Sequence, residues 1–487
     1  MNNWFKIIAL TASSMAFAQQ SFSLDEAWSY AVQHNVNVQK AKIDEAIAAQ
    51  KVKETTGIGL PQINAQAKYQ DYIKIPVMYV DFTNTGNLQE FKMAQKYNFN
   101  SGVTVSQLLF NGSYLVGLQS AKTYRETAKL ISEKTQLSVK EGIMMTYAGV
   151  LATDENIKTL EENKRVLDKN LSDTRTTYKV GLIELQNVEQ LEYSQKSMAT
   201  ALENLKRTRQ KLANALKYQL GYPIDQEIVL TSSFEELVAR NNALFSSDSV
   251  NYDSHVDVRL QQNLVRTNEL LLKLEKSKAL PSLAAFYSAN WNAVGNQMDA
   301  LKWTYPMLWG LQLDIPVFSG LQRHWRTEQA KLNVEKAKLD LDDTRKSLQN
   351  NTSAASIDFE NAIASFNNAR ELIALSTSIY NKQQIKFKEG MGTSFELSQA
   401  EAQLFDAQRQ YYEAALNLIQ TRTRLDQATG LLTTGTADPS NIGQRVQNTN
   451  VNTQNAAQQN IQNTTQKPTQ LQPQQPSTTT NPPIKNQ

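Results

Sequence analysis

The 487-residue chain contains no cysteine, 18 glycines and 12 prolines, and its 50 Lys and Arg against 47 Asp and Glu give a formal net charge of +3 at pH 7. The absence of cysteine excludes disulfides, thiolate metal sites and an acylated N-terminal cysteine, so any membrane attachment must come from the fold. The nearly balanced charge, without a basic block, argues against nucleic-acid binding.

The first 18 residues have the pattern of a secretory signal peptide. Lys6 precedes an apolar run, and Ala16-Phe17-Ala18 has the small-x-small form that signal peptidase cleaves. The run of about a dozen apolar residues is shorter than the roughly 20 that a membrane-spanning helix needs. We therefore predict a signal peptide over residues 1–18, with cleavage after Ala18. No later segment is apolar for long enough to span a membrane as a helix, so membrane entry is expected through strands.

Residues 19–221 are predicted to form one structural repeat, made of a helix, a strand pair, a long helix and a further helix. No proline lies between Pro76 and Pro223, and since proline in a helix interior costs about 3 kcal/mol, its absence permits very long helices. Hydrophobic residues recur every seven positions, which indicates left-handed coiled packing. The rows are Leu130, Leu137, Met144 and Leu151, and Leu191, Met198, Leu205 and Leu212.

We predict helices over about 24–56, 112–178 and 183–218. The rows break at Gly181, where the chain can reverse because glycine tolerates positive φ. At about 1.5 Å per residue the helix over 112–178 is roughly 100 Å long. The two shorter helices, placed end to end, match its length.

Residues 222–257 are predicted to be an irregular connecting region with one helix near residues 234–243, and residues 258–432 to form a second repeat. The second repeat has a reversal at Gly390-Met391-Gly392 and two further seven-residue rows. They are Phe359, Phe366, Ile373, Tyr380 and Phe387, and Leu397, Leu404, Tyr411, Leu418 and Leu425.

Four segments between the helices alternate with a period of two, which is the signal of a strand. Their apolar residues are Ile63, Ala65, Ala67 and Tyr69; Tyr97, Phe99, Val103 and Val105; Leu283, Ala285, Tyr287, Ala289 and Trp291; and Met307, Trp309, Leu311, Leu313 and Ile315. Each is about ten residues long, as a tilted membrane strand requires. Aromatic residues in or beside them suit the boundary between membrane and water. They are Tyr69, Tyr97, Trp291, Trp303 and Trp309.

The order of elements occurs twice, so the chain is an internal duplication. Matching segments are Leu60-Pro61 and Leu280-Pro281; Phe110-Asn111-Gly112 and Phe318-Ser319-Gly320; and Tyr178-Lys179-Val180-Gly181 and Phe387-Lys388-Glu389-Gly390. Four strands cannot close a barrel, for which about eight are needed, and open edges in lipid cost several kcal/mol per unpaired group. Several copies must therefore share one barrel, and the residues alone leave two, three or four copies open.

Residues 433–487 are rich in Gln, Asn, Thr and Pro and contain no aromatic residue. Such a composition cannot bury enough apolar surface to offset its ordering entropy, so a disordered tail is expected there.

No catalytic, cofactor or metal site is predicted. The three histidines, His34, His255 and His324, lie far apart, and no phosphate-binding, dinucleotide-binding or nucleophile-elbow motif occurs. The chain is therefore not expected to be an enzyme.

The duplicated motifs, in this order, resemble those of the TolC family of outer-membrane efflux proteins from about Leu24 to Leu432. The resemblance implies a mixed α and β membrane protein, a homotrimer with a shared 12-stranded β-barrel of four strands per chain, continued by a long periplasmic coiled-coil α-barrel. It also implies the outer-membrane component of a tripartite efflux or type I secretion system, with a periplasmic adaptor and an inner-membrane RND or ABC pump as partners. Drug, metal-ion and protein export all stay open as its task.

The resemblance also places the periplasmic entrance at the two helix reversals. The expected entrance residues are Tyr178, Gly181, Asn187, Phe387, Gly390, Gly392, Glu396 and Gln399. Asn187 takes the place of an acidic residue and Gly392 that of an arginine, so the family's charged lock is absent and Asn187 is expected to contribute little to closure. Glu396 matches the first of two pore-facing aspartates and Gln399 replaces the second. Glu396 could instead be a solvated carboxylate near a helix N-terminus.

Two alternatives belong to other classes. A secreted structural coiled coil explains the seven-residue rows but not four membrane-length strands. An ordinary porin explains strands but requires many more of them and no 100 Å helices.

Overall fold

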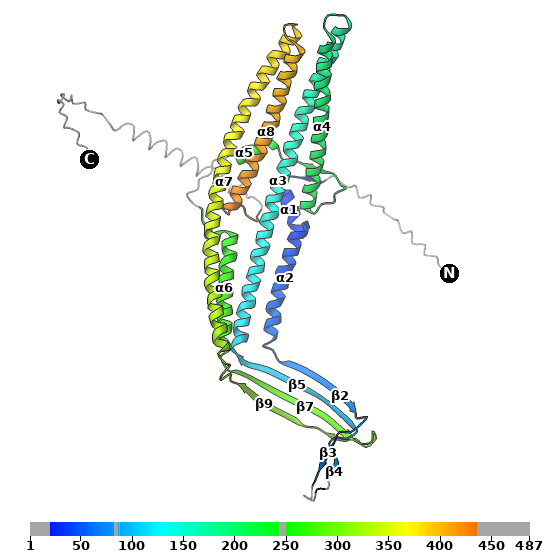
Figure 1. The fold of residues 1–487 in the computed structure, drawn as a ribbon, viewed down its shortest axis with the longest axis vertical. Helices are drawn as coiled ribbons and strands as arrows, with labels where there is room; N and C mark the ends of the chain where they lie inside the picture. The colour runs from blue at the N-terminus through cyan, green and yellow to red at the C-terminus, as the bar shows by residue number, and fades with distance from the viewer. Residues whose placement is uncertain (1–19, 82–85, 87, 243–249, 436–487) are drawn as a thin grey trace, which may run out of the picture. The chain divides into compact units, whose positions relative to one another are not determined.

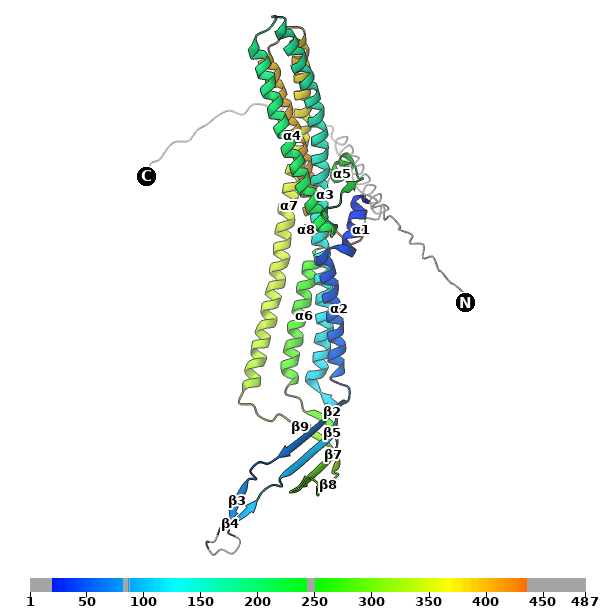
Figure 2. The ribbon, with the colours of Figure 1, turned by 90° about the vertical axis from the view of Figure 1, so that its right-hand side faces the viewer.

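The computed structural model describes residues 20–81, 86, 88–242 and 250–435. Residues 1–434 form one unit and residues 435–487 a second. The predicted signal peptide, with Ala16 and Ala18, and the predicted tail from residue 436 onward lie outside the described residues. Within the first unit, a curved sheet occupies one end and long helices extend from it (Figures 1 and 2).

Two very long helices run the length of the helical part, α3 (Gly112–Lys179) and α7 (Gln322–Lys388). Shorter helices pack beside them: α1 (Leu24–His34), α2 (Val36–Gly57) and α4 (Leu185–Leu220) along α3, and α6 (Val256–Ser277) and α8 (Ser394–Ala428) along α7. In the first repeat the shorter helices together thus match the long helix in length, as predicted, and the second repeat has the same arrangement. None of the described helices is long and apolar enough to cross a membrane.

The predicted helix over 24–56 is broken at Asn35, which the sequence pattern did not reveal. Asn35 is extended at φ −65° and ψ 125°, and its side-chain oxygen caps α2 by accepting from the backbone N–H groups of Asn37 and Val38. Its Nδ2 donates to the carbonyl of Gln219 at 2.6 Å, 184 residues away. The break is therefore held by a contact with the end of α4.

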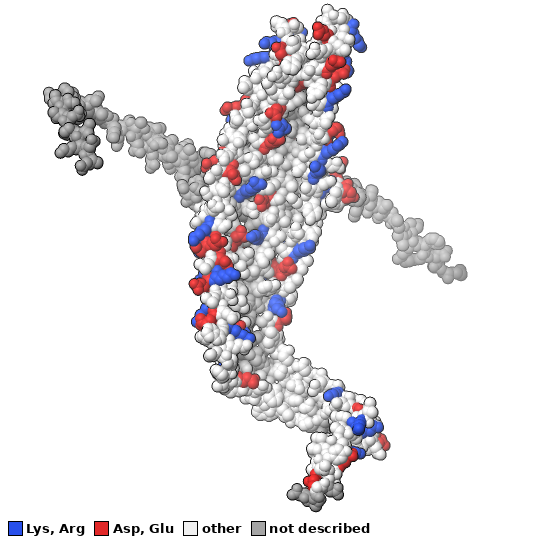
Figure 3. Space-filling model, viewed as in Figure 1, with Lys and Arg blue, Asp and Glu red and all other residues white. Residues whose placement is uncertain are grey.

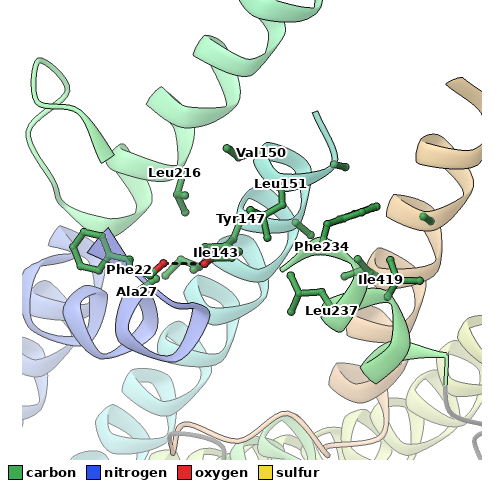
Figure 4. Close-up of a cluster of buried hydrophobic side chains, with 14 of the residues drawn as sticks. Phe22, Ala27, Ile143, Tyr147, Val150, Leu151, Leu216, Phe234, Leu237 and Ile419 are labelled. Atoms are coloured by element: carbon green, nitrogen blue, oxygen red, sulfur yellow. Dashed lines mark hydrogen bonds between the residues drawn. The ribbon is translucent and has the colours of Figure 1, made fainter. Parts of the chain in front are cut away.

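Many side chains of the seven-residue rows lie in two buried clusters, together with apolar residues from outside the rows. The waist cluster lies at mid-length, where the N-terminal segment, α3, α5 (Phe234–Asn241), α7 and α8 meet (Figure 4). Tyr147 is fully buried in it and donates from its hydroxyl to the carbonyl of Phe22 at 2.8 Å. The tip cluster lies nearer the helix reversals and includes Leu167, Leu191 and Leu397.

The connecting region contains two elements that the sequence did not predict, β6 (Ile228–Leu230) and a 3₁₀ turn. Strand β1 (Gln20–Phe22) pairs in parallel with β6, and the short 3₁₀ turn, η1 (Tyr252–Ser254), precedes α6. The predicted helix near residues 234–243 is present as α5. Beyond the second repeat, the carbonyls of Thr433 and Thr434 accept from Lys140 Nζ and Trp28 Nε1, at 2.8 and 3.1 Å.

All four predicted strands are present: β2 (Gln62–Asp71), β5 (Tyr97–Asn111), β7 (Ser282–Gly295) and β9 (Met307–Asp314). They pair antiparallel in the order β2-β5-β7-β9, and β8 (Lys302–Thr304) also pairs with β7. The hairpin of β3 (Val77–Val80) and β4 (Gln89–Lys92) extends beyond the far end of the sheet (Figure 2) and was not predicted.

The register of the strands gives the sheet one apolar and one polar face. Ile63 lies opposite Val105, Val105 opposite Tyr287, and Tyr287 opposite Trp309. Since alternate residues share a face, the predicted apolar rows of all four strands lie on the same side. The polar face carries Gln, Asn, Ser and Thr residues, with hydrogen bonds such as Asn100 Nδ2 to Asn98 Oδ1 at 2.6 Å. On the side seen in Figure 3, charged side chains are spread along the helices and are sparse over the sheet until its far end.

Candidate channel entrance

Both helical hairpins reverse at the end of the unit away from the sheet, at the glycines that the sequence singled out (Figures 1 and 2). Gly181 has φ 77° and Gly390 has φ 72°. After α3, the N–H of Leu182 donates to the carbonyl of Thr177 at 3.2 Å, and after α7 the N–H of Met391 donates to that of Lys386 at 2.9 Å. These bonds satisfy carbonyls that the helix ends leave free. The predicted reversals are confirmed.

Gly181→Ala and Gly390→Ala are each expected to lower the free energy of unfolding by about 1–2 kcal/mol, because a Cβ disfavours the left-handed backbone. An added Cβ at either position meets nothing within 4 Å, so the backbone alone carries the cost. Gly117 in α3 is the matched control, since it is helical and equally uncrowded. Gly117→Ala should raise stability by about 0.5–1 kcal/mol. Thermal unfolding followed by circular dichroism measures both, and equal shifts in the same direction for Gly181 and Gly117 would contradict the assignment.

Asn187 joins the two hairpins. The hydroxyl of Ser394, at the start of α8, donates to Asn187 Oδ1 on α4 at 2.6 Å, across 207 residues of sequence. Ser394 is only 4% exposed. One turn farther from the tip, the hydroxyls of Ser194 and Ser398 lie 3.2 Å apart. Neutral hydrogen bonds therefore connect α4 to α8 where the charged lock of the family was expected to be missing. Ser394 was not predicted as a site residue.

We expect the Asn187–Ser394 bond to be worth about 1 kcal/mol, the usual net value of a hydrogen bond inside a protein. Asn187→Ala should cost more than this, about 1–3 kcal/mol, because it leaves the buried Ser394 hydroxyl without its acceptor. A double-mutant cycle of Asn187→Ala and Ser394→Ala isolates the pair. A coupling free energy below about 0.3 kcal/mol would show that the bond contributes nothing to joining the hairpins.

Glu396 caps the first turn of α8. The hydroxyl of Thr393 accepts from the backbone N–H of Glu396 at 3.2 Å, and Glu396 Oε2 accepts from the N–H of Thr393 at 3.1 Å, a capping box. Gln383 Nε2 of α7 donates to the same oxygen at 2.9 Å. The hydrogen bond from the Thr393 backbone is the main cause that lowers the pKa of Glu396 below its ordinary value. The carboxylate is thus a solvated helix cap, and its pore-facing position stays a prediction.

The remaining expected entrance residues differ in their surroundings. Phe387 packs against the tip cluster, whereas Tyr178 is 39% exposed beside the first reversal. The backbone N–H of Gly392 donates to the carbonyl of Lys386 at 3.1 Å, and a Cβ at Gly392 would lie 3.2 Å from the backbone nitrogen of Phe387. A glycine at position 392 therefore lets the chain pass close to the end of α7, where a side chain would be crowded.

The predicted boundary aromatics lie on the sheet, mostly toward its far end. Tyr69 is opposite Phe99, whose ring packs edge-on against Trp303 at 5.7 Å. Tyr97 carries the ammonium of Lys96 over its ring at 4.9 Å. Trp309, opposite Tyr287, is nearer the helical end and is 78% exposed. Their place at a membrane boundary stays a prediction.

Among the described residues, no group of three or more His, Asp and Glu side chains is arranged to hold a metal ion.

Comparisons with known proteins agree with this architecture. Residues 259–431 match the sequence model of the outer membrane efflux protein family. The chain is 20% identical over 449 residues to the outer membrane protein TolC of Salmonella enteritidis, which covers 88% of this chain and 85% of TolC. The outer membrane channel CmeC of Campylobacter jejuni superposes with a TM-score of 0.67 at 16% identity, covering 87% of this chain and 88% of CmeC. The open state of the MtrE outer membrane channel of Neisseria gonorrhoeae gives 0.63 at 15% identity, covering 85% and 91%.

At such identities the likeness to the two solved channels shows a shared fold. The family match over the second repeat and the alignment with TolC along most of both chains agree with the duplicated motifs of the sequence. Residues 259–431 thus match the outer membrane efflux protein family, and along most of its length the chain is similar to TolC.

Proposed function

We propose that this outer-membrane efflux channel is a passive exit duct from periplasm to exterior, assembled from three copies of the chain. The observation that carries the proposal is the four-stranded sheet with one apolar face, one polar face and two unpaired edges. Among the described residues, β2 and β9 each pair with one neighbouring strand of this sheet. Three copies, joined edge to edge, give twelve strands, enough to close a barrel with its apolar face toward lipid and its polar face toward water.

The apolar face argues against a secreted structural coiled coil. Trp309, Leu311 and Leu313 on β9 are 78%, 61% and 58% exposed, and the apolar face continues from them across β7 to β2. A continuous apolar surface of this kind requires a lipid or protein partner. The long helices, with their charged outer surfaces, suit an aqueous compartment, and we assign them to the periplasm.

Energy must come from elsewhere, because the chain has no nucleotide-binding motif. We infer that an inner-membrane RND or ABC pump supplies it and that a periplasmic adaptor links pump and channel, making this chain the outer component of a tripartite efflux or type I secretion system.

The proposal is tested by separating inner and outer membranes on a sucrose gradient and by inserting the purified protein into planar lipid bilayers. We expect the protein in the outer-membrane fraction and discrete conductance steps in the bilayer. Recovery from the soluble fraction, or a membrane-bound protein that never conducts, contradicts it.

A further inference from the structure

A cleft runs between α3, α4 and α8 on the helical part near the tips, with a volume of about 900 Å³. It extends from Phe395, at the start of α8, toward Thr208 and Leu416. Its lining is mainly apolar and includes Leu160, Met198, Leu205, Phe405 and Tyr412. The volume is that of a site for a small organic molecule, and such sites are usually apolar with a few placed polar groups.

One buried acid belongs to the lining of this cleft. Glu401 of α8 is 3% exposed, and its Oε2 has no hydrogen-bond partner among the described residues. It lies between Leu397 and Leu404 of the tip cluster, near Tyr380 of α7. Burial raises the pKa of Glu401 to about 7. A buried carboxyl with an unbonded oxygen destabilises the fold, so a functional role would explain why it is present.

No cation of the described chain neutralises Glu401. The only basic residue lining the cleft, Arg409, is engaged by Asp406 at 2.5 Å and by Glu413 at 3.0 Å, on its own helix. The α3 and α4 residues of the lining carry no charged group, and the only titratable side chain among them is Tyr193. From α7, Tyr380 faces Glu401, and burial, with the Glu401 charge as the second cause, raises the pKa of its phenol to about 12.

We propose that this cleft binds an amphipathic organic cation, with its apolar part against Met198 and Phe405 and its positive group paired with the carboxylate of Glu401. A positive charge is the partner that a desolvated carboxylate lacks, and pairing in low dielectric favours the ionised form. The apolar walls select a cation with a hydrophobic body over a small inorganic ion. This site goes beyond the proposed duct function, because binding requires no conduction.

The proposal predicts a pH dependence with a definite sign. The cation binds the ionised form of Glu401, so affinity is full above pH 7 and falls as Glu401 takes up a proton below it. For a group with a pKa of about 7, the ionised fraction changes about tenfold between pH 8 and pH 6, and the affinity should change with it. The hydrogen bond from Arg409 is the main cause that lowers the pKa of the exposed Asp406 below its ordinary value, so Asp406 stays ionised in this range.

The test is fluorescence anisotropy of rhodamine 6G, a permanent organic cation, with the full chain in detergent at pH 6 and pH 8. Wild type should bind saturably and about tenfold more tightly at pH 8. Glu401→Gln keeps the shape but removes the charge, and should weaken binding by roughly 30-fold at pH 8 and abolish the pH dependence. Glu413→Gln removes an acid from the rim of the same cleft and is the matched control, with a change of at most about threefold.

Two further measurements separate the cleft from unspecific association. Ala201 lines the cleft from α4 and is exposed, so Ala201→Trp should block binding by filling the space while leaving Glu401 unchanged. The anion 8-anilinonaphthalene sulfonate should not compete. Absence of saturable rhodamine binding to wild type, as when a neighbouring copy covers the cleft, overturns the proposal, and so does equal binding by Glu401→Gln. Neither result concerns conductance, so the proposed duct function is tested independently by the bilayer and fractionation experiments.

Discussion

Leu311→Pro is expected to weaken the association between chains while leaving the sheet within each chain intact. The N–H of Asn290 on β7 donates to the carbonyl of Pro306 at 2.9 Å, just before β9 begins. In an antiparallel pair, inward and outward backbone groups alternate, so the N–H of Leu311 points away from β7, toward the free edge. If that edge pairs with a neighbouring copy in lipid, each unmade bond costs about several kcal/mol, and three equivalent interfaces lose one bond each.

The measurement is the temperature at which the purified oligomer dissociates, with mass determination before and after heating. Leu311→Ala is the matched control, because it shortens the same side chain without removing the N–H. It should leave the dissociation temperature close to that of wild type, whereas Leu311→Pro should lower it clearly. The same reasoning applies to β2. The Tyr72 N–H donates to the Lys96 carbonyl at 2.9 Å, so the backbone N–H of Ala67 points away from β5, toward the other free edge of the sheet.

Leu308→Pro gives the opposite comparison, since the Leu308 N–H faces β7 and its loss should damage the sheet of a single chain. If the chain functioned as a monomer, Leu311→Pro should have little effect on its stability, because proline is accepted on edge strands whose N–H faces solvent. An unchanged dissociation temperature for Leu311→Pro, or a monomer with native helix content, would contradict the proposal that several copies share one barrel.

Glu396→Gln is expected to reduce the preference of the channel for cations over anions and to weaken block by divalent cations. In three copies, Glu396 would form one acidic ring at the entrance, and acidic rings select cations. The hydrogen bond from the Thr393 backbone lowers the pKa of Glu396 below its ordinary value, so the carboxylate stays ionised and selectivity should be constant from pH 8 down to about pH 5. Reversal potentials in a salt gradient across a planar bilayer measure the effect.

Gln399→Glu provides the matched gain of charge, since it places an acid one turn beyond Glu396 on α8. If both residues face the pore, the double variant Glu396→Gln, Gln399→Glu should recover cation preference. Glutamine can still accept from the Thr393 N–H, so the capping box largely survives and a loss of selectivity cannot be ascribed to unfolding of α8. Unchanged reversal potentials for Glu396→Gln would mean that Glu396 is only a helix cap.

The sequence by itself determined most of the local structure of this protein. A seven-residue period indicated the helices, a two-residue period indicated four strands and the side chains that share a face, and Gly181 and Gly390 marked the reversals. These signals lie within windows of a few turns or a few strand residues, because backbone propensity and amphipathic period act over that range.

Only the tertiary structure decided which distant segments meet. The contact of Asn35 with Gln219, the pairing of β1 with β6, and the bond of Ser394 with Asn187 each join residues about 200 positions apart, and no local period encodes such partners. The environment of Glu401 could not be predicted from the sequence either. Its position between Leu397 and Leu404 predicts a place beside the apolar stripe of the coiled helices, where charged residues are common. Its burial and missing partner arise from α3, α4 and α7 packing around α8, and a carboxyl loses its water only when that surrounding structure has formed.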